Sequence, residues 1–313
     1  MIIHLGYVSI SITLNITSSK TITYTEFIKH NDYNKLDNII IENLSNLEKI
    51  IDYNIKNNIH FYRLTSKLIP LATHREINFD YINKYQSLYQ EIGNKINKHN
   101  IRIDTHPDQF CVLNSTKKDI VDNSILILKF HYNILKALNI KNKIIILHIG
   151  SSVLVKQNSI KRFINNFYKL PKYIQECIAI ENDDKIYNIK DCLLLCETLN
   201  IPMVLDYHHH ICNNDNLNID DYLERIFKTW KNLPPKIHFS SPKNKTKKDF
   251  RSHHDYIDIN DFIQFLEKIK HYNINLDIML ECKQKDEALF KLVRQLKYYN
   301  YHFIDDTTIK LTN

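Results

Sequence analysis

The chain has 313 residues, 43% of them hydrophobic and 25% charged, so it can bury a sizeable core as one large domain or two small ones. No apolar run approaches the ~20 residues of a membrane span, and three glycines are too few for the loops that cradle nucleotide phosphates, so we expect neither a membrane partner nor a nucleotide cofactor. The formal net charge of +7 is modest and only permits an anionic partner.

Eight short segments rich in β-branched residues recur along the chain and predict β-strands. They cover residues 2–7, 60–64, 101–105, 143–148, 177–181, 203–206, 236–239 and 276–281. Each has four to eight residues, and most are almost continuously apolar. Such runs are typical of parallel strands that are buried on both faces.

Segments of helical periodicity lie between these strands, the clearest at residues 79–98, 118–138, 220–230, 259–272 and 287–299. The helix at 220 opens with two aspartates, which are favourable near a helix N-terminus. No linker rich in proline or glycine interrupts the alternation, so we expect residues 1–313 to form a single α/β domain. Eight nearly even strand–helix repeats favour a (β/α)8 TIM barrel over a doubly wound sheet.

Histidine, aspartate and glutamate residues gather at the carboxyl ends of the predicted strands. The third strand is followed by His106, the fourth ends at His148 and the fifth at Glu181. The active sites of barrel enzymes are built at this rim, whereas histidines scattered by chance would also fall on helices and at amino ends. The candidate metal ligands are therefore His74, His106, His148, Glu181, Asp206, His209, His238, His253 and Glu281.

The mixture of imidazole and carboxylate groups indicates the kind of metal. It suits Zn²⁺, Mn²⁺ or Fe²⁺, whereas oxygen ligands alone would indicate Mg²⁺ or Ca²⁺. One tetrahedral ion takes four ligands, so nine candidates predict two or three divalent ions. Such a cluster activates water and stabilises the entering and leaving oxygens during phosphodiester hydrolysis. The alternative is that some of the nine are ordinary polar residues at strand ends.

Nine segments that span residues 1 to about 290 form a series of motifs. They read, in order, LGYVSIS, YRLTSKLIPLATH, IDTHPDQFCVLN, ILHIGSS, IAIENDD, VLDYHHHICN, KIHFSSPK, RSHHDYI and DIMLECKQKDEAL. These motifs resemble those of the UV damage endonuclease family, which itself resembles endonuclease IV in its barrel and metal cluster. The resemblance implies a DNA repair endonuclease that cuts duplex DNA immediately 5′ to UV photoproducts. Its substrates would be cyclobutane dimers and 6-4 photoproducts, and it would need no ATP.

The same resemblance implies roles for individual residues. The nine candidates would be the metal ligands, with His74 in the least constrained loop, and the ions would be Mn²⁺, or else Zn²⁺ or Mg²⁺. Glu181, His238 and Glu281 would also act in catalysis, together with Lys236. Lys236 precedes His238 by two residues, so both point to the same face of the strand. It would be a phosphate clamp or a lysine modified to carry an anionic group, unless it is an exposed lysine at a strand start.

Damaged double-stranded DNA is the expected partner, and three features predict contacts with it. Gln109 and Phe110 follow the third strand and resemble a wedge that family members insert at the lesion, unless Phe110 packs into the top of the barrel. The loop after the seventh strand is basic and must lie on the rim, where Lys243, Lys245, Lys247, Lys248 and Arg251 can contact phosphates. Tyr7, at the end of the first strand, is a weaker candidate.

Three other interpretations remain open. An abasic-site endonuclease of the endonuclease IV type would use the same metals on a different lesion. A sugar isomerase-like barrel needs fewer ligands and does not explain the basic loop. A metal-free nucleic-acid-binding module would not depend on Glu281. We expect the protein to be a monomer.

The six cysteines bear on the cellular compartment. None forms a CxxC pair and several lie in apolar segments, so we expect buried free thiols in a reducing compartment. The N-terminal segment lacks a basic stretch, so we expect no signal peptide. These features predict an intracellular protein of the cytoplasm, nucleoid or nucleus.

Overall fold

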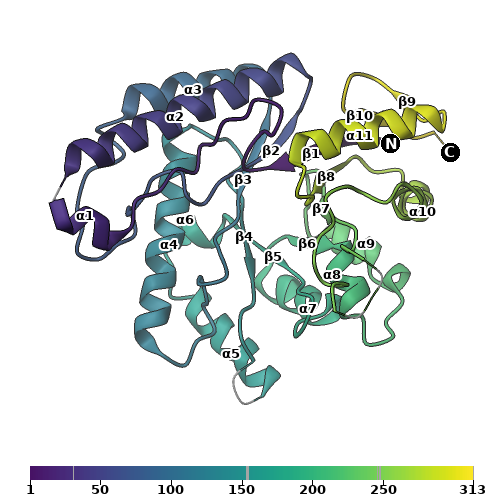
Figure 1. Cartoon of the computed structure of the whole chain (residues 1–313). Helices are drawn as coiled ribbons and strands as arrows, with labels where there is room; N and C mark the ends of the chain where they lie inside the picture. Colours follow the sequence, from purple (N-terminus) through teal and green to yellow (C-terminus); the bar gives the residue numbers. More distant parts are fainter. Residues whose placement is uncertain (31, 153–154, 245, 247, 313) are drawn as a thin grey trace.

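The eight predicted strands form a closed parallel barrel (Figure 1). The computed structural model describes residues 1–30, 32–152, 155–244, 246 and 248–312. The barrel strands are β1 (Ile2–Val8), β2 (Phe61–Leu64), β3 (Arg102–Thr105), β4 (Ile145–His148), β5 (Ile178–Glu181), β6 (Met203–Asp206), β7 (Lys236–Phe239) and β8 (Leu276–Leu280). They pair in chain order from β2 to β8, and β1 pairs with both β8 and β2. This closure confirms the predicted (β/α)8 fold.

Helices surround the barrel (Figure 1). They are α1 (Tyr24–His30), α2 (Tyr33–Lys56), α3 (Gln86–Lys98), α4 (Lys118–Ala137), α5 (Lys156–Phe167), α6 (Lys172–Gln175), α7 (Ile189–Leu199), α8 (Tyr207–Cys212), α9 (Leu223–Lys228), α10 (Ile259–Ile269) and α11 (Lys285–Tyr298), with 3-10 helices η1 (Ile219–Asp221) and η2 (Lys270–Tyr272). Because helices cover their outer face, β2, β5, β6 and β7 are buried along their whole length. None of the helices in the described residues is long and apolar enough to cross a membrane.

The longest helix of the described chain, α2 with 24 residues, is absent from the sequence prediction. Asn43, Asn46 and Asn54 are buried on its inner face among leucines and isoleucines, so its apolar stripe is interrupted. The helix predicted from residue 79 begins at Gln86, because residues 79–85 form coil and turns. The boundaries therefore differ most where asparagine and turn-forming residues dilute the periodicity.

The inside of the barrel carries ionisable side chains at several levels, where apolar layers are usual for this fold. Arg102 and Asp104 of β3, and His106 directly after it, alternate along the chain and so lie on one face. Arg102 Nη1 donates to Asp277 Oδ2 of β8 at 2.6 Å, although β3 and β8 are not neighbours in the sheet. The buried charges are thus joined across the barrel by ion pairs.

The seam between β1 and β2 depends on a glycine. A Cβ at Gly6 would lie 2.3 Å from the carbonyl oxygen of Phe61, which is closer than any side chain tolerates. Only glycine lets the two strands approach closely enough to close the barrel.

Both chain ends lie at the amino end of the barrel (Figure 1). A hairpin of β9 (His302–Phe303) and β10 (Thr308–Lys310) follows α11, and β10 pairs antiparallel with the start of β1. The N-terminal ammonium of Met1 donates to the Leu311 carbonyl at 3.1 Å. All six cysteines are free thiols, as expected.

Candidate active site

Strand register brings the candidate ligands together at the carboxyl end of the barrel. His148 at the end of β4 pairs with Glu181 at the end of β5. Asp206 at the end of β6 pairs with His238 of β7, and Glu281 follows β8 directly. Residues paired in register lie at one level of a parallel barrel, so these side chains converge on its axis.

Glu181 is the centre of this cluster. It is 1% exposed and belongs to three groups of residues whose ligand atoms lie within 4.8 Å of one another. The groups are His106–His148–Glu181, Glu181–His238–Glu281 and Glu181–Asp206–His209. Seven of the nine predicted ligands are thus brought together.

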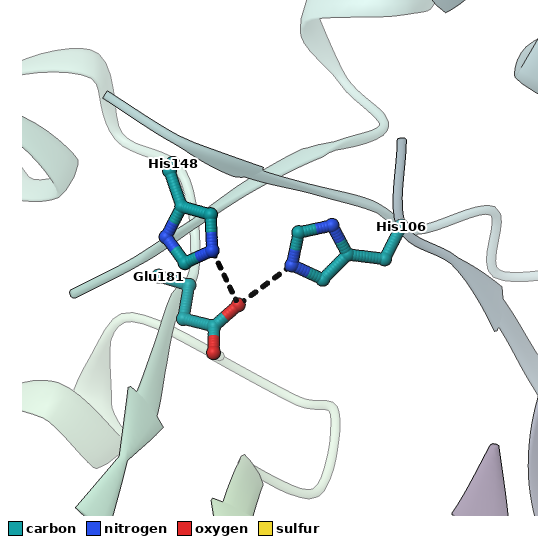
Figure 2. Close-up of side chains that lie close together, drawn as sticks. All are labelled: His106, His148 and Glu181. Carbon is teal, nitrogen blue, oxygen red and sulfur yellow. Dashed lines mark hydrogen bonds and ion pairs between the residues drawn. The ribbon is translucent and has the colours of Figure 1, made fainter. Parts of the chain in front are cut away.

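In the first group, two imidazoles point at one carboxylate oxygen (Figure 2). His106 Nε2 lies 2.8 Å from Glu181 Oε2, and His148 Nε2 lies 3.6 Å from the same oxygen. The Nδ1 atom of His148 is buried and has no hydrogen-bond partner among the described residues. The three side chains come from the ends of three consecutive strands.

The hydrogen bonds of His106 test whether this group fits a cation. Its Nδ1 lies 2.8 Å from the carbonyl oxygen of Pro107, which can only accept, so Nδ1 carries the proton and donates. In a neutral imidazole this leaves the Nε2 lone pair facing the carboxylate of Glu181. This lone pair and the carboxylate oxygen repel each other unless a proton on Nε2 or a metal ion bound by both lies between them. A ring held through Nδ1 in this way is the form that ligates divalent metals, so the donor set fits a metal.

Asp206 and His209 supply a second indication of a metal site. Asp206 caps α8, where its Oδ1 accepts the N–H of His209 at 2.7 Å, but its Oδ2 is buried without a hydrogen-bond partner among the described residues and lies 3.5 Å from His209 Nδ1. His209 Nδ1 donates to the Asn182 carbonyl at 3.0 Å, which leaves Nε2 available as a ligand atom. A buried carboxylate oxygen without a partner is unfavourable, and a ligand role accounts for it.

The electrostatics around the cluster keep two of its carboxylates ionised. Burial disfavours the charged form of Glu181, but the neighbouring histidines, His238 foremost, hold its pKa well below the usual range. At Glu281, Arg63 and His238 likewise outweigh burial and lower the pKa. Asp206 differs, because burial dominates there and raises its pKa to about 8.

Sequence interpretation missed two charged residues beneath the ligands, Arg63 of β2 and Asp104 of β3. Arg63 Nη1 contacts Glu281 Oε1 at 2.6 Å, and Asp104 pairs with Lys236. The available signal was a charged residue within a short buried strand, since a charge there needs a partner. Lys236 is 1% exposed, so it is not an exposed lysine, and burial lowers its pKa to about 7. Its catalytic role stays a prediction.

Two predicted ligands lie outside the three groups. His253 is at the edge of the cluster, with Nδ1 4.0 Å from Glu281 Oε2. His74 stacks on Tyr24 with ring centroids 3.9 Å apart, and its Nδ1 accepts the N–H of Glu76 at 3.4 Å. Ligand roles for both histidines stay predictions.

The loop after β3 presents Gln109 and Phe110 at the surface beside the cluster. Phe110 is 66% exposed, so it does not pack into the top of the barrel. The side chain of Asp108 accepts the Phe110 N–H at 3.1 Å and so fixes the turn that presents the ring. A cavity of about 300 Å³ lies between this loop, His148 and Asp183.

The basic loop starts after β7 and returns to the rim at His253. Pro242 and His253 form an isolated antiparallel bridge that holds the two ends of the loop together. The exposed basic residues of this loop are Lys243, Lys248 and Arg251. The other two predicted contacts, Lys245 and Lys247, lie outside the described residues.

Tyr7 does not reach the surface, so the predicted contact with DNA is wrong. Its side chain is fully buried, and its hydroxyl donates to Asn54 Oδ1 of α2 at 2.8 Å. Its ring packs against Tyr62 of β2 with centroids 5.2 Å apart. Tyr7 therefore faces the helix layer and not the rim, because side chains alternate between the two faces along β1.

These features define a (β/α)8-barrel enzyme with a candidate metal centre at its carboxyl end. The sequence profile of the family described as UV-endonuclease UvdE matches residues 3–309, and the chain belongs to this family. A UV DNA damage endonuclease of Bacillus mycoides (strain KBAB4) is 42% identical over 303 residues, which are 95% of each chain. A UV DNA damage endonuclease of Bacillus thuringiensis subsp. konkukian (strain 97-27) is 41% identical with the same coverage.

Solved structures agree with this membership. The crystal structure of SacUVDE superposes with a TM-score of 0.86 at 34% identity, covering 95% of this chain and 99% of that one. Endonuclease IV from Thermus thermophilus shares the fold, with a TM-score of 0.57 at 8% identity over 95% of this chain and 98% of that one. The predicted family is thereby confirmed, and the chain is a DNA repair endonuclease that acts on UV damage, a hydrolase of phosphodiester bonds.

Proposed function

We propose that this enzyme hydrolyses the phosphodiester bond immediately 5′ to a UV photoproduct in duplex DNA, with two or three divalent ions, foremost Mn²⁺. The observation that carries this proposal is the sharing of Glu181 among three ligand groups. Its two oxygens face different partners, since Oε1 lies 2.7 Å from His238 Nδ1 and Oε2 lies 2.8 Å from His106 Nε2. A carboxylate with this arrangement can bridge two ions.

The chain contributes fixed ligand orientations. The Pro107 carbonyl holds the ring of His106 and the Asn182 carbonyl holds that of His209, so each histidine presents Nε2 before DNA arrives. Divalent ions bound here would supply an activated water and offset the charge that develops on the phosphate oxygens. No step draws on ATP.

The rim supplies recognition of the damage. Photoproducts weaken base stacking, and Phe110 is placed to enter the duplex at such a step, where stacking on an aromatic ring contributes roughly 1–3 kcal/mol. The exposed side chains of Lys243, Lys248 and Arg251 would contact backbone phosphates on the same face. Specificity then depends on how easily the duplex deforms more than on base identity.

Incision of end-labelled duplexes tests the reaction. The substrates carry one cyclobutane thymine dimer, one 6-4 photoproduct, one abasic analogue or no damage, and each is incubated with Mn²⁺ or with a chelator. We expect a single cut immediately 5′ to each photoproduct when Mn²⁺ is present, and no cut when the chelator is present. Cutting at the abasic analogue without cutting beside either photoproduct would overturn the proposal in favour of an abasic-site endonuclease. Glu181→Gln, purified in parallel, controls for contaminating nucleases.

Elemental analysis of the purified protein tests the metal assignment. We expect two or three equivalents of divalent metal per chain, with Mn²⁺ supporting incision better than Zn²⁺ or Mg²⁺. One equivalent or none would contradict the shared-ligand interpretation of Glu181. A monomer in a reducing compartment, where the six thiols remain free, completes the proposal.

A further inference from the structure

Arg63 lies directly beneath the ligands and contacts two of them. All four residues of β2 are buried, and the side chain of Arg63 is 9% exposed. Its Nη1 donates to Glu281 Oε1 at 2.6 Å, and its Nη2 contacts Nε2 of His238. A guanidinium is permanently charged and has no acceptor atom, so Arg63 donates in both contacts.

The contact with His238 has a consequence for metal binding, because a neutral imidazole has one lone pair. His238 Nδ1 lies 2.7 Å from Glu181 Oε1 and 3.2 Å from Glu281 Oε1, so Nδ1 is the atom that completes the ligand group. Ligation through Nδ1 uses that lone pair and leaves the ring proton on Nε2. Nε2–H and the Arg63 N–H are then both donors, so this contact and ligation through Nδ1 exclude each other.

Asp104 offers Arg63 another partner. Arg63 Nε and Asp104 Oδ1 lie 3.5 Å apart, and each is buried without a hydrogen-bond partner among the described residues. The other oxygen of Asp104 is engaged by Lys236. A small shift of the guanidinium toward Asp104 would satisfy both free atoms and release His238.

We propose that Arg63 is a positioning residue that competes with a metal ion for the Glu181–His238–Glu281 group. This inference rests on the metal dependence proposed above. The guanidinium holds Glu281 and His238 at the cluster, and it turns to Asp104 when His238 ligates an ion. A fixed positive charge beside one ligand group opposes a second cation there. The ion of this group is therefore the most weakly bound of the cluster.

Titration with Mn²⁺, followed by the electron paramagnetic resonance signal of the free ion, tests the competition. Arg63→Met should tighten the most weakly bound Mn²⁺ by about tenfold, because a buried cation leaves the group. Arg63→Lys should tighten it by about threefold, because an ammonium keeps the charge but contacts one ligand instead of two. Without metal, Arg63→Met should also have a lower melting temperature than the parent protein. The difference in melting temperature should be smaller when both proteins are saturated with Mn²⁺.

If Arg63 had a purely structural role, its replacement would leave the Mn²⁺ affinity unchanged or lower it. If Arg63→Met binds Mn²⁺ with unchanged or lower affinity, the inference is overturned. If that variant does not fold, Arg63→Lys serves instead, since it keeps the buried charge. A higher Mn²⁺ affinity of Arg63→Lys supports the inference, and an unchanged or lower affinity overturns it.

Arg102→Met is the matched control, because Arg102 also pairs with a buried carboxylate but at the amino end of the barrel. We expect it to lower the melting temperature and leave Mn²⁺ affinity unchanged. An equal rise in affinity for Arg102→Met would indicate general loosening and overturn the inference. If the parent protein itself binds no Mn²⁺, the proposed metal dependence fails first, and that failure is visible without any Arg63 variant.

Discussion

The two ends of the barrel both hold buried charge, but they differ in how that charge is satisfied. At the amino end, Asp277 accepts from His4 at 2.8 Å and from Arg102 at 2.6 Å, so one carboxylate has two positively charged or polar donors. At the carboxyl end, Nε2 of His106 and Nε2 of His148 both face one oxygen of Glu181, and one oxygen of Asp206 has no hydrogen-bond partner among the described residues. Both oxygens of Asp277 are thus satisfied by protein donors, whereas the carboxylates at the carboxyl end leave a buried oxygen that a metal ion would satisfy.

Cavity size does not separate the two ends. A cavity of about 370 Å³ lies beside His4 and Arg102 at the amino end, and the cavity beside His106 and His148 is smaller, at about 300 Å³. The difference lies in the side chains, since His106 and His148, which line the second cavity, both direct Nε2 at one oxygen of Glu181. Charges that neutralise each other stabilise the fold, whereas imidazoles and carboxylates that converge form a candidate cation site.

The largest expected effect is at the carboxyl end, with Glu181→Gln. Because Glu181 is shared by three ligand groups, its loss should lower kcat/KM for a dimer-containing duplex by at least about 1,000-fold and reduce the bound metal. Incision rates and elemental analysis of the folded variant measure both. A variant that keeps its full complement of metal would show that Glu181 does not organise the cluster.

Asp277→Asn is the counterpart at the amino end. Removing one partner of a buried pair should lower the free energy of unfolding by about 3 kcal/mol. Incision by the folded variant should remain unchanged, because Asp277 lies at the opposite end of the barrel from the ligands. Urea denaturation and initial rates below the unfolding transition check the two statements, and a large loss of incision would break the distinction between the ends.

Metal binding at the carboxyl end of the barrel should depend on pH. Burial raises the pKa of Asp206 to about 8, so below that pH its carboxyl holds a proton that an ion must displace. Mn²⁺ affinity should therefore rise between about pH 6 and pH 8, by up to about tenfold per unit. Calorimetry in buffers of different ionisation enthalpy counts the protons released. Zero protons released at pH 7 would contradict the buried, protonated Asp206.

The smallest expected effect is at the exposed wedge. Phe110→Ala should lower kcat/KM at a dimer by about tenfold through lost stacking and leave unfolding unchanged, since the ring is 66% exposed. Tyr298→Ala removes an aromatic ring that is 83% exposed at the end of α11, away from the rim, and should change neither quantity. Equal losses for both variants would argue against insertion of Phe110.

Much of the barrel was predictable from the sequence because each buried parallel strand is a short apolar run. β6 and β7 have the predicted bounds, and the other strands of the barrel differ by one or two residues at an end. The outer layer was less predictable, since α2 buries asparagines where leucine or isoleucine would mark its inner face.

The site was predictable to the extent that it follows strand ends. Glu181 and His148 lie at strand ends and meet through register, which the order of strands determines. Arg63 and Asp104 were missed because their partners, Glu281 directly after β8 and Lys236 of β7, are distant in sequence. The local pattern shows a charge within a buried strand, but only three-dimensional closure shows which residue pairs with it.

The meeting of the chain ends at the amino end of the barrel has a practical consequence for handling this enzyme. Met1 contacts Leu311, and both lie at the end opposite to the ligands. An affinity tag, a fluorophore or a surface tether attached at either terminus would project from the amino end of the barrel. The enzyme can thus be immobilised or labelled with the rim that carries the candidate ligands turned outward, for example to follow single incision events on a stretched duplex.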